Sequence, residues 1–97
     1  MSHGLRFTSR ARREARAVRE WYEQQRPGLG RRFAEAMEVV ATRLTESPEI
    51  YQVVHRDLRR AATDHFPFSV FHRVEGEAVT VLAVLHMHRD PSTWRGL

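Results

Sequence analysis

The apolar residues of this chain change their spacing near its middle, and this change restricts the fold more than any other feature of the sequence. From Ser9 to Gln25 they recur at intervals of three and four, and the same spacing returns from Leu29 to Glu46. This period predicts two amphipathic helices. From Ile50 onward, β-branched and aromatic residues are frequent, which is typical of strands. The sequence therefore predicts a helical first half and a sheet-forming second half.

A short break joins the two predicted helices. Pro27 cannot lie inside a helix, and the glycines at positions 28 and 30 permit a tight turn. Two amphipathic helices joined so closely are expected to form an antiparallel hairpin over a common core. Strands are predicted over residues 5–8, 50–54, 58–66, 68–74 and 78–87. We expect one α+β domain, residues 1–97, in which a small twisted antiparallel sheet with an N-terminal strand carries the hairpin on one face, in the order β-α-α-β-β-β(β).

The last predicted strand, residues 78–87, is almost continuously apolar, which suggests a central strand covered on both faces. The helices would cover one face, and the tail from Pro91 to Leu97 or a partner chain would cover the other. Gly76 is expected at a positive φ in the loop before this strand. Whether that loop has two or three residues decides if His72 and His86 share a face, and the sequence leaves the register open.

The charged residues exclude several kinds of chemistry. All 16 basic residues are Arg, and with 12 acidic residues the net charge is +4, which favours an anionic partner such as nucleic acid or an acidic polypeptide. The lack of Lys excludes Schiff-base chemistry, and the lack of Cys excludes thiolate catalysis and cysteine-ligated zinc. We expect no cofactor and no metal. The longest apolar stretch, Val81–Leu85, is too short to span a membrane, so a cytoplasmic protein without membrane contact is expected.

Five segments, taken in order, carry a likeness to a known family: Glu20–Phe33, Leu58–Arg60, Phe66–Val74, Val81–Pro91 and Trp94-Arg95. Together they resemble the RelE/ParE superfamily of type II toxin–antitoxin toxins over nearly the whole chain. The resemblance implies a small bacterial toxin that a cognate antitoxin holds inactive in a hetero-oligomer, by wrapping an extended or helical segment around it. It also implies two possible activities: RelE-like members are ribosome-dependent mRNA endoribonucleases, often with a Tyr near the end of the chain, whereas ParE-like members poison DNA gyrase without cutting nucleic acid.

The residues favour the second activity. RNA cleavage needs a base, an acid and cations, and Arg supplies only the cation. The chain has no Lys, and its two tyrosines, Tyr22 and Tyr51, lie far from its end. We therefore expect a ParE-like toxin that binds DNA gyrase and is neutralised by a ParD-like antitoxin with an acidic C-terminal segment. A ribosome-dependent mRNA endoribonuclease and an inactive, antitoxin-binding relative remain as alternatives, so enzymatic activity stays open.

The residues expected to contact the target or the antitoxin are mostly cationic: Arg59, Arg60, Arg73, His86, Arg89, Trp94 and Arg95. In a nuclease, the catalytic groups would be Arg59, Arg73, His86 and Arg89, with His65, His72 and His88 as further candidates. A partly buried strand Arg needs a carboxylate, carbonyl or phosphate partner. Arg59 and Arg73 could therefore form internal ion pairs instead, with Asp57, Asp64 or Glu75.

The first predicted helix carries a stripe of Arg12, Arg16 and Arg19. Because Glu20 and Glu23 follow at a spacing of four, we expect a solvated face with Arg16–Glu20 and Arg19–Glu23 pairs. No helix-turn-helix pattern and no suitably placed base-reading Asn or Gln accompanies the stripe, so it does not predict DNA recognition.

Overall fold

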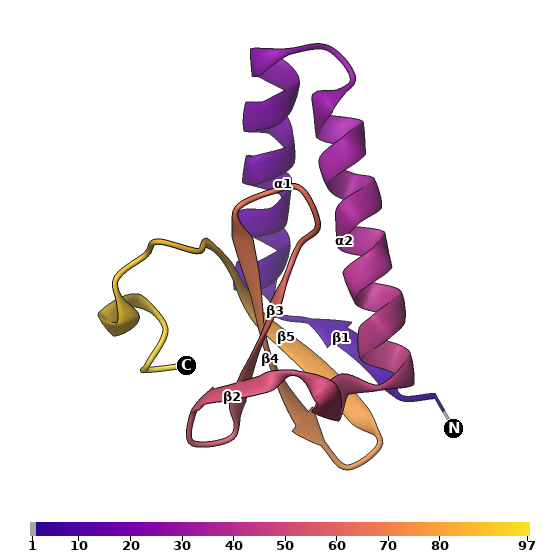
Figure 1. Cartoon of the computed structure of the whole chain (residues 1–97), viewed down its shortest axis with the longest axis vertical. Helices are drawn as coiled ribbons and strands as arrows, with labels where there is room; N and C mark the ends of the chain where they lie inside the picture. The colour runs from indigo at the N-terminus through magenta and orange to yellow at the C-terminus, as the bar shows by residue number, and fades with distance from the viewer. Residues whose placement is uncertain (1) are drawn as a thin grey trace.

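The computed structural model describes residues 2–97 and confirms the α+β prediction (Figure 1). Met1 of the expected 1–97 domain lies outside the described residues. The chain forms β1 (Gly4–Phe7), α1 (Ser9–Gln25), α2 (Leu29–Glu46), β2 (Gln52–His55), β3 (Leu58–Ala62), β4 (Phe68–Glu75) and β5 (Ala78–His86). Short 3₁₀ turns precede β2 at Pro48–Ile50 and lie in the tail at Pro91–Thr93. Across these residues, neither helix is long and apolar enough to cross a membrane.

The five strands form one sheet in the order β1-β5-β4-β3-β2. The pairs among β2, β3, β4 and β5 are antiparallel as expected, but β1 pairs parallel with β5, so the sheet is mixed. A parallel pair needs a long crossover connection, and the helical hairpin, with the strands that follow it, supplies one. β5 is therefore an interior strand, which explains its apolar sequence.

The ends of the helices follow from local hydrogen bonds. Thr8 caps α1, because its Oγ1 accepts from the Ala11 amide at 3.1 Å. Gly28 provides the turn with a φ of +89°. Gly30 has a different role: it lies inside α2, where an added Cβ would approach the Arg19 carbonyl oxygen to 2.7 Å. The second glycine therefore permits the close approach of α1 and α2.

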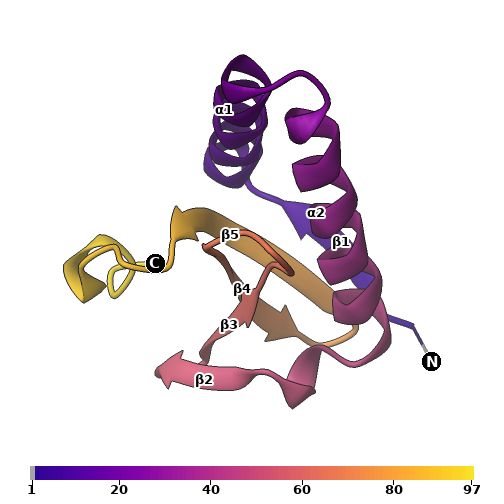
Figure 2. The ribbon, with the colours of Figure 1, turned by 45° about the horizontal axis from the view of Figure 1, so that its top comes forward.

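The inner core lies between the helices and the sheet. Phe33 of α2 contacts Phe66 and Phe68 with ring centroids 5.4 and 5.6 Å apart, and Tyr22 of α1 lies 4.9 Å from Phe66. Buried aliphatic side chains complete this core: Ala11, Val40, Leu44, Ala61, Val70, Val79, Val81 and Val84. Figures 1 and 2 show both helices on this side of the sheet, with the turn between them projecting beyond it.

A second, smaller core covers the outer face of the sheet. Trp94 in the tail is only 8% exposed and stacks on Phe71 of β4, with ring centroids 5.2 Å apart and an interplanar angle of 23°. Leu58, Ala83 and Leu85 lie in the same cluster. Of the two covers expected for this face, the tail or a partner chain, the tail is therefore the one that packs on it here.

The register of β4 and β5 places His72 and His86 on the same face. Gly76, at a φ of +64°, and Glu77 form a two-residue loop between the paired residues Glu75 and Ala78. Leu82 is an extra residue in β5, because Phe71 pairs with Ala83 while His72 pairs with Val81. His86 pairs with Phe68, which lies four residues before His72, so alternation along β4 directs both histidines to the helix-covered face.

Candidate interaction site on the outer sheet face

A cationic hollow of about 820 Å³ opens between the β2–β3 turn, β4 and the C-terminal tail. Three arginines, one histidine and one acidic side chain are among the residues that line it: His55, Arg56, Asp57, Arg73, Arg95, Gly96 and Leu97. Two of the expected contact residues, Arg73 and Arg95, meet here although 22 positions separate them. The excess of guanidinium groups makes this hollow attractive to anions.

Arg73 is held rigidly within the hollow. Its Nε donates to Asp57 Oδ1 at 2.8 Å, and its Nη2 donates to the main-chain oxygen of Leu97 at 2.9 Å. The hydrogen bond from Arg73 lowers the pKa of the Asp57 carboxyl below its ordinary value. Arg73 therefore forms the internal ion pair with Asp57 that was one of the two expectations for this side chain. Arg73 thus connects the β2–β3 turn to the tail.

Arg56 and Arg95 are the cations of the hollow that remain available to a partner. Arg56 stands at a φ of +55° in the β2–β3 turn, and its side chain is exposed. The Arg95 guanidinium carbon lies 6.0 Å from the centroid of the Trp94 ring. Within residues 2–97, neither guanidinium has a carboxylate within 4.0 Å. These two arginines can therefore bind an incoming carboxylate or phosphate without breaking an existing ion pair.

The two arginines of β3 point to opposite faces. Arg60 pairs with Phe71 and lies on the outer face, half-buried. Arg59 pairs with His72 on the inner face, where its Nη1 donates to the carbonyl oxygens of Glu49 at 3.0 Å and Tyr51 at 2.8 Å. Carbonyl groups therefore satisfy Arg59, which holds the segment before β2 against β3.

The inner-face histidines lie away from the hollow. His72 is fully buried; its Nδ1 is 3.1 Å from the Val70 carbonyl oxygen, and its Nε2 has no hydrogen-bond partner. Burial lowers the pKa of His72 below its ordinary value. His86 contacts Phe68, with ring centroids 5.4 Å apart, and its Nδ1 accepts from the His88 amide at 3.1 Å. Arg89 is exposed in the turn that follows β5.

These placements separate three of the four residues expected to act in a nuclease. Arg73 lies on the outer face, whereas Arg59 and His86 lie on the inner face. On the inner face, Arg59 is the β3 partner of His72, and His86 is the β5 partner of Phe68. His72 and Phe68 are four residues apart in β4, a distance of about 13 Å at the usual rise of a strand. No described group of three side chains is suited to holding a metal ion.

His55 and Arg56 were not among the candidates expected from the sequence. His55 is the last residue of β2, and Arg56 with Asp57 forms the connection to β3. The short gap between the two predicted strands was the available signal, because it places these side chains in a tight turn. The proximity of that turn to the tail depends on the tertiary structure.

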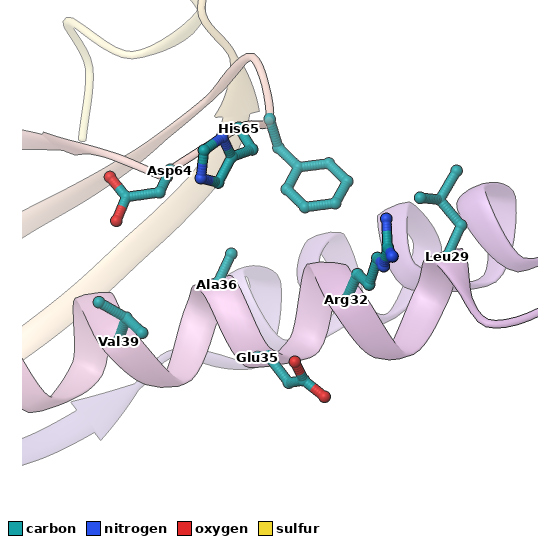
Figure 3. A pocket seen from close by; sticks show the side chains of 8 residues that line it. Leu29, Arg32, Glu35, Ala36, Val39, Asp64 and His65 are labelled. Carbon is teal, nitrogen blue, oxygen red and sulfur yellow. The ribbon is translucent and has the colours of Figure 1, made fainter.

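A second hollow, about 550 Å³, lies between α2 and the turn after β3 (Figure 3). Its polar lining is mixed, with one arginine, two acidic residues and one histidine: Arg32, Glu35, Asp64 and His65. In Figure 3, Glu35 points away from the turn. Apolar side chains contribute the rest of its lining: Leu29, Ala36, Val39 and Phe66. It offers space for an apolar side chain of a partner and gathers only one of the expected candidates, His65.

Residues 5–91 match the family described as ParE toxin of type II toxin-antitoxin system, parDE. Together, the fold and this match define a toxin of the type II toxin–antitoxin class. The match covers well over half of the chain, and the chain belongs to the ParE toxin family.

The fold is similar to that of a solved structure described as the chromosomal ParDE TA system from P. aeruginosa. The TM-score is 0.77, with 17% sequence identity, over 90% of this chain and 98% of that chain. No curated protein matches the sequence significantly.

Proposed function

We propose that this chain is a ParE-like toxin that stops growth by binding and poisoning DNA gyrase in the bacterial cytoplasm, and that a ParD-like antitoxin neutralises it. Family membership supports the type II toxin class. The observation that carries the choice of a binding poison is the separation of three catalytic candidates that the sequence indicated, Arg59, Arg73 and His86. Catalytic groups must lie within hydrogen-bond reach of the reacting atoms, about 3 Å, and Arg59, Arg73 and His86 do not converge on one point.

The cationic hollow supports an acidic partner. Arg56 and Arg95 are exposed there and make no ion pair with any residue of the described part of the chain, while Arg73 is already paired with Asp57. An acidic C-terminal antitoxin segment would place carboxylates against the two free guanidinium groups, which bind carboxylates in a bidentate manner. Arg60 on the same face, and Arg89 in the turn after β5, would extend this contact. Trp94 contributes by holding the tail in place.

Purified gyrase and a negatively supercoiled plasmid test the proposed target. After addition of the toxin and denaturation of gyrase, we expect linear plasmid, because a poison traps the enzyme on broken DNA. Equimolar antitoxin should suppress the linear product. If supercoiling proceeds unchanged and no breakage appears at a large excess of folded toxin, gyrase is not the target.

A paired substitution tests the hollow. The double variant Arg56→Gln/Arg95→Gln should bind antitoxin at least about tenfold more weakly, since each lost charge-assisted hydrogen bond is worth about 1.5–3 kcal/mol. The matched control is Arg31→Gln/Arg43→Gln, which removes the same charge from exposed positions of α2. Equal affinities for the two double variants would show that the hollow is not the contact.

One observation favours the endoribonuclease as a second candidate function. His55 lies beside Arg56, Arg73 and Arg95 in the hollow, so one imidazole ring shares a concave surface with two unpaired guanidinium groups and with a third that is paired with Asp57. In a translating extract, this alternative predicts cleavage of mRNA by the wild-type protein and no cleavage by the His55→Ala variant. Intact transcripts together with gyrase-dependent DNA breakage would exclude it, and the absence of both effects would indicate an inactive, antitoxin-binding relative.

A further inference from the structure

The outward side of α1 carries an arginine ridge, consisting of Arg12, Arg16 and Arg19. All three are exposed, and they stand at helical intervals of four and three, so they form one line along the helix. At a rise of 1.5 Å per residue, the line is about 10 Å long. Figure 2 shows α1 above the sheet, so the ridge belongs to a different part of the molecule from the cationic hollow.

The expectation that glutamates of the same helix pair with this ridge is wrong. Glu23 instead accepts hydrogen bonds from the Gly28 amide at 3.0 and 3.1 Å and from the Gly30 amide at 3.1 Å. It thereby satisfies amide groups at the start of α2, where a negative charge is favourable. Neither Arg19–Glu23 nor Arg16–Glu20 is among the ion pairs of residues 2–97.

Glu14 is also engaged elsewhere. Its Oε1 accepts from the Val84 amide at 3.0 Å, and its Oε2 accepts from Arg10 Nε at 3.2 Å. Val84 lies in β5 past Val81, the last residue of β5 that pairs with β1. Two of the three carboxylates of α1 therefore hold the fold together, and no described carboxylate lies within 4.0 Å of a ridge guanidinium. The ridge is a line of cations without ion-pair partners.

We infer that the arginine ridge binds the phosphate backbone of double-stranded DNA without reading its sequence. Duplex DNA carries about one negative charge per 1.7 Å of its axis, so a straight cationic line about 10 Å long faces several phosphates at once. The ridge itself holds no Asn or Gln, and its charged groups suit backbone contact instead of base recognition. The inference does not depend on the enzyme that the toxin inhibits.

An acidic polypeptide is the competing occupant. The groove beside the ridge, lined in part by Phe33, Ala34 and Met37, encloses only about 240 Å³. A stable protein interface generally buries about 800 Å² on each partner around an apolar centre, which this groove is too small to supply by itself. The uninterrupted line of exposed cations thus favours a polyanion with regularly spaced charges.

Fluorescence anisotropy with a labelled DNA duplex tests the inference, using the full chain at salt concentrations from about 50 to about 200 mM. The ridge variant Arg12→Gln/Arg16→Gln/Arg19→Gln should bind at least about tenfold more weakly at the lowest salt. The slope of log K against log salt should become shallower by about 2.7, from three lost phosphate contacts. Circular dichroism verifies that the variant is folded.

The matched control removes three other exposed arginines, Arg6→Gln/Arg31→Gln/Arg43→Gln, and so has the same net charge. It should keep wild-type affinity within about threefold and nearly the whole salt slope. Equal losses in both variants would overturn the inference, because diffuse positive charge would then explain binding. Failure of the wild type to bind the duplex at the lowest salt would also overturn it. So would displacement of the duplex by poly-glutamate at equal charge concentration, if the ridge variant lost its affinity for poly-glutamate as well. Gyrase inhibition, measured separately, tests the proposed function and not the ridge.

Discussion

Replacing Gly30 by Ala tests how closely α1 and α2 approach one another. The new Cβ would lie 2.7 Å from the Arg19 carbonyl oxygen and 3.0 Å from both Cβ and Oε1 of Glu23. Because Arg19 contributes a main-chain atom, a change of rotamer cannot relieve that contact. The helices must separate, and the hydrogen bond from the Gly30 amide to Glu23 must lengthen.

The expected cost follows from two opposing terms. Overpacking a tight contact costs about 1–3 kcal/mol, while the better helix propensity of Ala returns up to about 1 kcal/mol. The free energy of unfolding should therefore fall by about 1–2 kcal/mol. For a domain of this size, the melting temperature should fall by roughly 4–16 °C.

Urea unfolding followed by circular dichroism measures this change, with Gly96→Ala as the control. A Cβ at Gly96 meets no atom within 4 Å, so this variant should stay within about 0.5 kcal/mol of wild type. If Gly30→Ala were as stable as Gly96→Ala, the argument from the close helix contact would be refuted. A lower stability in Gly96→Ala than in Gly30→Ala would refute it equally.

Three further substitutions test other contacts. Glu14→Ala leaves the Val84 amide without its acceptor and should lower the free energy of unfolding by about 1–3 kcal/mol. Glu14→Gln keeps an acceptor oxygen and should lose less. Equal losses of the two variants in urea unfolding would contradict the role of Glu14 as acceptor for Val84. Trp94→Ala removes the ring stacked on Phe71 and should lower the free energy of unfolding by about 3 kcal/mol. Trp94→Phe keeps an aromatic ring and should lower it less. An unchanged unfolding midpoint for Trp94→Ala would mean that the tail adds no stability. Burial lowers the pKa of His72, so the unfolded chain binds this proton more readily and wild type should lose stability as pH falls below about 6.5. In melting curves across pH, His72→Phe should lose less stability over that range, and parallel profiles would exclude His72 as a cause.

Much of the secondary structure could be predicted because its causes are local. Apolar residues at helical spacing form α1 and α2, and Pro27 with Gly28 ends one helix before the next begins. The apolar run of β5 correctly indicated an interior strand covered on both faces. The parallel pairing of β1 was missed, because pairing between the two ends of a chain has no local signal.

The candidate site was predictable only in part. The sequence indicated that a partly buried Arg73 would need a partner, and Asp57 was among those considered. It could not indicate that Arg59 donates to carbonyl groups, or that His55 and Arg56 join Arg95 around one hollow. Such contacts depend on turn geometry and on the path of the tail.

The sequence by itself determined the α+β class, the helical hairpin, the family and an all-arginine positive charge, since periodicity, turn residues and composition act over short distances. The tertiary structure decided which of those charges remain free. Helix spacing predicts Arg19–Glu23 as a pair, yet Glu23 bonds to the amides of Gly28 and Gly30, and Glu14 to that of Val84. Main-chain donors whose usual partners are missing compete for the same carboxylates, and only the folded chain shows where those donors lie.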